Sequence, residues 1–354
     1  MSRKDLKYIL MITAASAAVL TGCGKGGSTL FEEGMEAVAR QEYRTALDDF
    51  SGALRIDSDK EQVYRGMGLA YMGREEYARA LGAFSKALSE AGMYPGELEF
   101  DINYYMAICY YKLGEYDNAI ACYDAITDLR RKETRAYFLR GNMRLCLNDV
   151  EGAMADFDSA ASLKKNDYSL YLDIYDSMMQ HDYVAQAETY LDIVKAGDQK
   201  LMSDYDKGRL CYYTGEYTRA CNYLERARGT ETDAERGAEL ISLLCECYKM
   251  QGQYDYATIA YSGYVEDYND AQICDRLGLC YVDQGDYAKA LEAFEKGKEI
   301  KENNTCMQEL CLNEIACYEY MGEYEKARVL LAEYMETYGS NEDLDREYAF
   351  LSTR

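Results

Sequence analysis

The tripeptide Gly-Glu-Tyr occurs at residues 114–116, 215–217 and 322–324, and two variants, Gly-Gln-Tyr and Gly-Asp-Tyr, occur at 252–254 and 285–287. An alanine follows each tyrosine three residues later, and four further alanines extend the series, at positions 46, 80, 153 and 187. The nine alanines are separated by 34, 39, 34, 34, 33, 37, 33 and 37 residues. A period of this length predicts a solenoid of stacked supersecondary units instead of one globular core.

The composition predicts that these units are helical. The 354 residues include one proline, no tryptophan and 37 tyrosines, and no run shows the strict alternation of a half-buried strand. Few helix breakers among many Ala, Glu, Lys and Leu residues favour helices. The repeats fill the chain from about Leu30 onward, which leaves no room for a separate catalytic domain.

Two further positions recur in each unit. A small residue stands twelve positions before the marker alanine in most units, as at Gly34, Gly68, Gly141, Gly208 and Gly278. A large apolar residue stands four positions after that alanine, as at Phe50, Phe84, Tyr123, Phe157 and Phe294. We expect the small residue to let two antiparallel helices cross closely, and the large one to lie on the buried stripe of the second helix.

The unit resembles the tetratricopeptide repeat, and the resemblance covers nearly all of the chain after residue 29. It implies an all-α fold, an α-solenoid of about nine helix-turn-helix repeats over residues 30–339, with a capping helix over 340–354. The fifth unit, residues 167–200, fits the pattern worst, because its tyrosine is shifted to Tyr183 and the small-residue position holds Tyr175.

The N-terminus is a different kind of segment. A start with three basic residues precedes 13 uncharged, mostly apolar residues, 8–20, which is short for a membrane span but suits a signal peptide. The sequence Leu20-Thr21-Gly22-Cys23 resembles a bacterial lipobox. The resemblance implies that residues 1–22 are a lipoprotein signal peptide, that Cys23 is lipidated, and that 23–29 form a flexible tether. The alternative is an ordinary secreted protein in which Cys23 has no special role.

The chain is strongly acidic. Its formal net charge is −24, and removal of residues 1–22 with their three basic residues and one aspartate changes it to −26. Such a surface disfavours nucleic acid as a partner. The acidity either keeps a helical array soluble or attracts a basic partner.

Nothing in the sequence indicates catalysis, a cofactor or a metal site. His181 is the only histidine and falls in a predicted turn, and no Cys-x-x-Cys or glycine-rich phosphate loop is present. Export would allow disulfides among the 13 cysteines, but several fall at one helical position in successive units, too far apart to pair. We expect buried free thiols and no enzymatic activity.

A binding surface follows from the resemblance. In tetratricopeptide arrays the first helix of each unit lines a concave groove, and the matching positions give Arg65, Tyr104, Tyr111, Lys112, Arg135, Phe138, Asn142, Tyr205, Arg209 and Tyr212. Aromatic residues and arginine are enriched at binding hot spots. The alternative is that some of these tyrosines pack between repeats. The last three units place acidic residues at the same positions, among them Asp275, Glu309 and Glu319.

The sequence therefore predicts a non-catalytic scaffold that holds a peptide or protein partner in this groove and is anchored through Cys23. Its expected location is the extracytoplasmic side of a bacterial cell membrane, with a role in envelope assembly or secretion. The alternative is a glycan-binding surface lipoprotein that stacks sugars on the groove tyrosines, against which the absence of tryptophan counts.

Overall fold

The computed structural model describes residues 28–40, 42–56, 59–92, 95–230, 234–300 and 306–354. Within these ranges it contains nineteen α-helices, one short 3-10 helix and no strand, which confirms the predicted all-α solenoid. The chain divides into two compact units, of which the first ends at Val194 and the second begins at Lys195. The described ranges exclude the signal peptide and Cys23, so both stay predictions.

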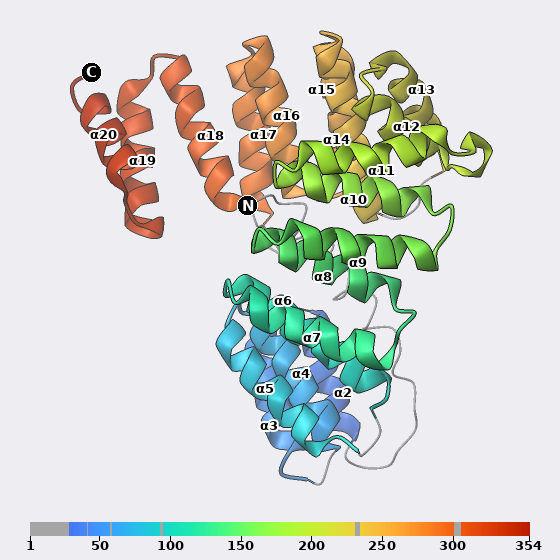
Figure 1. Cartoon of the computed structure of the whole chain (residues 1–354). Coiled ribbons are helices and arrows are strands. Elements are labelled where there is room, and N and C mark those ends of the chain that lie inside the picture. The colour runs from blue at the N-terminus through green and yellow to red at the C-terminus, as the bar shows by residue number, and fades with distance from the viewer. Residues whose placement is uncertain (1–27, 41, 57–58, 93–94, 231–233, 301–305) are drawn as a thin grey trace. The chain divides into compact units, whose positions relative to one another are not determined.

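In the first unit, antiparallel helices follow one another in chain order (Figure 1). Their bounds are α2 Ser28–Ala39, α3 Tyr43–Ala53, α4 Lys60–Gly73, α5 Tyr77–Glu90, α6 Glu97–Lys112, α7 Tyr116–Leu129, α8 Thr134–Cys146, α9 Val150–Leu163, α10 Tyr168–Gln180 and α11 Val184–Ala196, whose last two residues are counted with the second unit.

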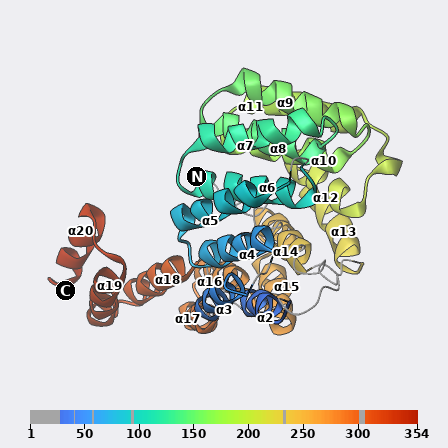
Figure 2. The same cartoon turned by 90° about the horizontal axis from the view of Figure 1, so that it is seen from below.

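The second unit continues the same pattern, and both views show α16 beside α17 with α18 to α20 following in order (Figure 1 and Figure 2). The bounds are η2 Gln199–Leu201, α12 Asp204–Tyr213, α13 Tyr217–Arg228, α14 Ala234–Met250, α15 Tyr254–Asp267, α16 Ala271–Gln284, α17 Tyr287–Glu299, α18 Met307–Tyr320, α19 Tyr324–Tyr338 and α20 Glu342–Leu351.

The glycine of the recurring tripeptide ends the first helix of each pair. Gly285 has a φ of 76° and accepts the left-handed conformation that a tight helix end requires. Where the tripeptide is absent, Glu75, Asn148 and Asp182 take the same turn position with φ values of 60° to 63°. The poorly matching fifth repeat thus keeps the turn geometry through Asp182, because a short polar side chain tolerates this conformation.

The small residue of each unit makes room for the large one. A Cβ atom on Gly68 would lie 2.3 Å from the Phe84 ring, and a Cβ on Gly278 would lie 2.3 Å from Phe294. Both phenylalanines are fully buried. The second helix therefore presses an aromatic ring onto the backbone of the first, as the spacing predicted.

Tyrosines of the tripeptide position, or their counterparts, cover the junction with the next repeat. Tyr43 lies over Gly73, where an added Cβ would come within 2.2 Å of its ring. Tyr287 stacks on Tyr320 of the following repeat with ring centroids 5.6 Å apart. Tyr324 has no later repeat to cover among the described residues and instead contacts Phe350, in α20, with centroids 6.5 Å apart. The helix α20 therefore covers the last helix pair as a capping helix.

Candidate functional site

The predicted groove residues of the first unit fall into an exposed group and a buried group. Tyr104 in α6 is partly exposed, and Arg135 at the start of α8 is exposed with its guanidinium carbon 5.8 Å from the Tyr104 ring centroid. Burial of the phenol and the nearby Glu133 raise the pKa of Tyr104. Lys112, at the end of α6, is also partly exposed, and burial lowers its pKa. These side chains offer two cations and part of an aromatic ring at the surface, whereas the Tyr104 hydroxyl is buried.

Phe138 and Asn142 lie on the same face of α8 as Arg135 but are buried. The Phe138 ring packs against Phe157 with centroids 5.8 Å apart. Asn142 is 5% exposed, and its side-chain oxygen Oδ1 accepts no hydrogen bond from the described residues. A buried acceptor without a donor costs about 1–3 kcal/mol. The Asn142 oxygen would therefore be stabilised by a hydrogen-bond donor from a partner.

The remaining predicted residues of the first unit serve its packing. Arg65 is buried, donates from Nε to Asp101 Oδ2 at 2.9 Å, and lies 5.4 Å from the Tyr105 ring centroid. Tyr111 is buried against Tyr116. Their burial supports, for these two residues, the alternative that groove positions pack between repeats.

In the second unit, the three predicted residues form one cluster on α12. Arg209 is buried, with its guanidinium carbon 5.8 Å from the Tyr205 ring centroid. The Tyr205 hydroxyl donates to Glu239 Oε2 at 3.5 Å, and Tyr212 makes edge contacts with Tyr213 and Tyr217. The Tyr205 hydrogen bond to α14 and the contact of Tyr212 with Tyr217 of α13 therefore connect these rings to neighbouring helices.

Two of the acidic residues predicted for the last units interact with neighbouring side chains. Asp275 is buried and accepts a hydrogen bond from Asn313 Nδ2 at 2.7 Å. Burial and the neighbouring Glu347 raise the pKa of Glu319 to about 7. His181 is the residue that ends α10, and its backbone N–H donates to Met178.

Sequence reasoning missed a buried ion-pair network in the first unit. Arg140 donates from Nε to Asp156 Oδ2 at 2.9 Å and from Nη1 to Asp124 Oδ1 at 2.6 Å, and Arg144 Nη1 lies 2.8 Å from Asp156 Oδ2. Asp156 is only 2% exposed. The one available signal was a carboxylate directly before the buried Phe157.

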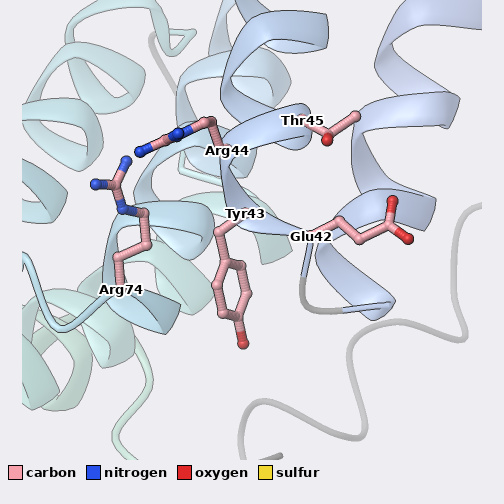
Figure 3. A pocket seen from close by; sticks show the side chains of 5 residues that line it. All are labelled: Glu42, Tyr43, Arg44, Thr45 and Arg74. Atoms are coloured by element: carbon pink, nitrogen blue, oxygen red, sulfur yellow. The ribbon is translucent and has the colours of Figure 1, made fainter.

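Two clefts were also missed. A shallow one of about 420 Å³ in the first unit is lined by Glu42, Tyr43, Arg44, Thr45 and Arg74, with the Arg44 and Arg74 guanidinium groups pointing toward one another (Figure 3). Arg74 pairs with Glu76 at 2.7 Å. A narrower one of about 100 Å³ lies in the second unit, beside α12 and α13.

No helix in the described ranges is both long and apolar enough to cross a membrane. Across the same residues, no group of three or more His, Cys, Asp or Glu side chains could hold a metal ion.

Comparison with known proteins identifies the repeats. Models of the tetratricopeptide repeat match residues 31–97 and 105–168, and another matches 271–304. The CTR9 homolog of Arabidopsis thaliana is 23% identical over 289 residues, which make up 77% of this chain and 26% of that protein. The human RNA polymerase II-associated protein 3 is 22% identical over 47% of this chain. The chain spans about a quarter of the length of either relative.

One solved structure supports the fold. The human IFIT1 dimer with PPP-AAAA aligns at 14% identity with a TM-score of 0.51, over 99% of this chain and 85% of that one. A tetratricopeptide repeat protein from Parabacteroides merdae aligns at 16% identity with a TM-score of 0.48, over 82% of this chain and all of that one. The three matched segments are tetratricopeptide repeats, and the fold is an α-solenoid of such repeats, an architecture typical of protein–protein interaction.

Proposed function

We propose that this protein is a scaffold that binds a peptide or protein partner on the inner helix faces of its first unit. The observation that carries the proposal is the pair Tyr104 and Arg135 from neighbouring inner helices, in which the exposed Arg135 lies over the ring of the partly exposed Tyr104. Tyrosine and arginine supply a large share of binding energy at protein interfaces, because they combine apolar area with directional hydrogen bonds. Repeat solenoids bind partners along such surfaces.

The chemistry of this surface suggests an extended segment with an acidic or carboxylate group. Arg135 and Lys112 are the cations that would pair with it, and Tyr104 would contact an apolar side chain. Asn142 supports the same reading, because a backbone N–H of an extended peptide is the donor that its Oδ1 lacks among the described residues. Reaching this oxygen requires the Asn142 side chain to turn toward the partner, since it is buried in the free protein.

The geometry favours a peptide over a glycan. A sugar needs an open aromatic face, whereas Tyr111 is buried and the rings of Tyr104 and Tyr212 are covered in part by neighbouring aromatic rings. No described feature adds support to the glycan alternative.

A peptide array read with the full chain tests the proposal. We expect defined peptides to bind the wild type, and the double substitution Tyr104→Ala and Arg135→Ala to abolish that binding. Arg79→Ala is the matched control, because Arg79 is an exposed arginine beside another tyrosine, Tyr71, on the outer helix α5. Equal binding by the double variant and the control would refute the assignment of the site.

The variant Asn142→Leu separates binding from packing. It removes an unmet acceptor from a buried position, so thermal stability should hold or rise while peptide affinity falls. A loss of stability together with unchanged affinity would assign Asn142 to the core.

We further propose that the scaffold is a bacterial lipoprotein, anchored through Cys23 on the extracytoplasmic side of the cell membrane. The support is the lipobox-like sequence and the short apolar stretch before it. Metabolic labelling with an alkyne fatty acid should mark the wild type and leave Cys23→Ala unlabelled. Labelling of the alanine variant, or a soluble unlabelled wild type, would exclude the anchor and leave the scaffold proposal intact.

A further inference from the structure

Two connections between consecutive repeats of the first unit carry an exposed leucine followed by cations. They read Leu-Arg-Arg-Lys at 129–132 and Leu-Lys-Lys at 163–165, and in each the leucine is the last residue of a helix, α7 or α9. Leu129 is 62% exposed and Leu163 is 37% exposed. We call these two segments the basic edge. They combine exposed apolar area with positive charge in a chain whose formal net charge is −24.

Contacts of Arg140, in α8, show that the two segments of the basic edge are neighbours. Its guanidinium group binds Asp124 in α7, from Nη1 at 2.6 Å, and Asp156 in α9, from Nε at 2.9 Å, so these two helices pass side by side. Leu129 comes five residues after Asp124, and Leu163 comes seven residues after Asp156. At 1.5 Å per residue, the two helices end about 8 and 11 Å beyond the shared arginine. Both helices run opposite to α8, and both of their connections leave the same side of the first unit (Figure 1).

Most of the cations of the basic edge are not neutralised by a neighbour. Arg130 pairs with Glu97, and Lys164 Nζ lies 3.7 Å from Asp167 Oδ2. The other three cations are exposed and have no ion-pair partner among the described residues: Arg131, Lys132 and Lys165. The edge therefore presents positive charge to whatever lies against it.

The opposite edge of the same two repeats has the reverse charge. The six residues that begin just before each leucine of the basic edge, 128–133 and 162–167, hold together five cations and three carboxylates. The matching segments at the turns within these repeats, 112–117 and 146–151, hold one cation and four carboxylates. Their leucines, Leu113 and Leu147, are 41% and 40% exposed. An exposed leucine is thus common to both edges, and the basic edge is the one that joins it to positive charge.

The start of the array lies at the same edge. The first helix of each repeat begins where the connection from the previous repeat ends, and α2, the first helix of the first described repeat, begins at Ser28. Cys23 precedes Ser28 by five residues, which span at most about 18 Å. This step rests on the lipoprotein proposal: an anchor at Cys23 would attach the array to the membrane from the edge that carries the exposed cations.

We propose that the basic edge docks onto an anionic phospholipid surface. Its lysines and arginines pair with lipid phosphates, each strengthening binding about fivefold, while Leu129 and Leu163 enter the headgroup layer. At physiological salt, charges more than about 8 Å away are largely screened, so the acidic remainder of the chain does not cancel this attraction. A soluble polyanion such as nucleic acid would use the cations but gain nothing from the exposed leucines, which favours the lipid surface.

Co-sedimentation with lipid vesicles tests the proposal. The chain from residue 24 is used, because it keeps every described helix and lacks the apolar stretch 8–20, which would bind vesicles by itself. We expect it to bind vesicles of phosphatidylglycerol and phosphatidylcholine, and not vesicles of phosphatidylcholine alone. The pair Arg131→Gln and Lys165→Gln should weaken binding about tenfold or more. The matched control pair, Arg79→Gln and Lys86→Gln, also removes an exposed arginine and an exposed lysine, both on α5, and should leave binding unchanged.

The leucines distinguish a membrane from another polyanion. Leu129→Ser together with Leu163→Ser should weaken vesicle binding about tenfold or more, because both side chains lose their apolar contact with lipid. The control pair at the opposite edge, Leu113→Ser with Leu147→Ser, removes similarly exposed side chains and should have no effect. Hydrogen exchange locates the contact, since vesicles should protect residues 129–134 and leave 113–116 unchanged.

Absence of binding to anionic vesicles, or equal weakening by the control pairs, would overturn the proposal. Unchanged binding by the variant without the two edge leucines would also overturn it, and would leave the edge as a site for a soluble polyanion. Fatty-acid labelling of Cys23 tests the anchor separately, because the vesicle assay uses an unlipidated chain. Either result can therefore fail without the other, and the peptide-array result is independent of both.

Discussion

The two compact units build the same helix pair with different chemistry at its buried polar positions. In the first unit, Arg140 and Arg144 converge on the buried Asp156, and Arg65 pairs with Asp101. In the second unit, the interior is rich in thiols, because nine of the twelve described cysteines lie there. Cys221, Cys245, Cys247, Cys274 and Cys280 belong to one core cluster with Leu244 and Tyr261.

This difference shows how much freedom the repeat leaves to its interior. The turn residue, the small-on-large helix crossing and the junction tyrosine are shared, and they fix the shape of the pair. The remaining buried positions hold either a hydrogen-bonded ion pair or a small apolar thiol. Both fill the space without burying a polar group that lacks a hydrogen-bond partner. Substitutions at the shared positions should therefore lower the stability of both units by similar amounts. Substitutions at the other buried positions should affect the two units differently.

The largest effect is expected at the shared helix crossing. Phe84→Ala and Phe294→Ala each remove a fully buried ring from the backbone of a facing glycine. Each should lower the free energy of unfolding by about 3–5 kcal/mol. Urea denaturation measures the free energy of unfolding of each variant. Hydrogen exchange shows which of the two units is destabilised. A large difference between the two variants would contradict the view that this crossing is common to both units.

The next effect should be confined to the first unit. Arg140→Met keeps the side-chain volume but leaves the buried Asp156 with Arg144 as its remaining ion-pair partner. Removing one partner of a buried ion pair should cost about 3 kcal/mol. Hydrogen exchange should show weaker protection of α8 and α9 and unchanged protection of α14 to α17. An equal loss in the second unit would show that the units do not respond separately.

A smaller effect should be confined to the second unit. Cys247→Ser replaces a fully buried thiol by a hydroxyl, at a cost of about 1–3 kcal/mol if no partner is found. Burial raises the pKa of Cys247 to about 12, so its thiol is protonated and apolar under ordinary conditions. Chemical denaturation measures the cost, and Cys146→Ser at a half-buried position of the first unit is the control. Equal costs would mean that the thiols of the second unit have no special packing role.

The smallest effect concerns pH and the capping helix. Burial and Glu347 raise the pKa of Glu319 from 4.5 to about 7, so folding favours the protonated carboxyl. The resulting stabilisation is fully present below about pH 4.5 and is lost as the pH rises through about 7. Because Glu319 is partly exposed, we expect less than about 1 kcal/mol. Thermal melts of wild type and Glu319→Gln across this range should differ in slope, and identical slopes would contradict the prediction.

The sequence was sufficient for the architecture and insufficient for the surface. Glycine at 114, 215 and 285 marks helix ends because few other residues adopt the required backbone conformation. The sequence did not show which side chains on the inward helical faces are exposed and which are buried. Tyr111 and Phe138 occupy the same helical face as Tyr104 and Arg135, yet they are buried, because exposure depends on how closely the next helix packs. Asp156 reads in the sequence as a surface charge, and only the three-dimensional approach of Arg140 shows it to be internal.

The tyrosines at the repeat junctions are intrinsic spectroscopic probes of whether those junctions are closed. The chain has 37 tyrosines and no tryptophan, so its near-ultraviolet absorbance comes mainly from phenols, several of which sit between one repeat and the next. Burial raises the pKa of Tyr77 to about 12, whereas a phenol in an unfolded segment ionises near 10. An alkaline titration therefore reads the opening of repeat junctions as phenolate absorbance that appears at lower pH, without an added label.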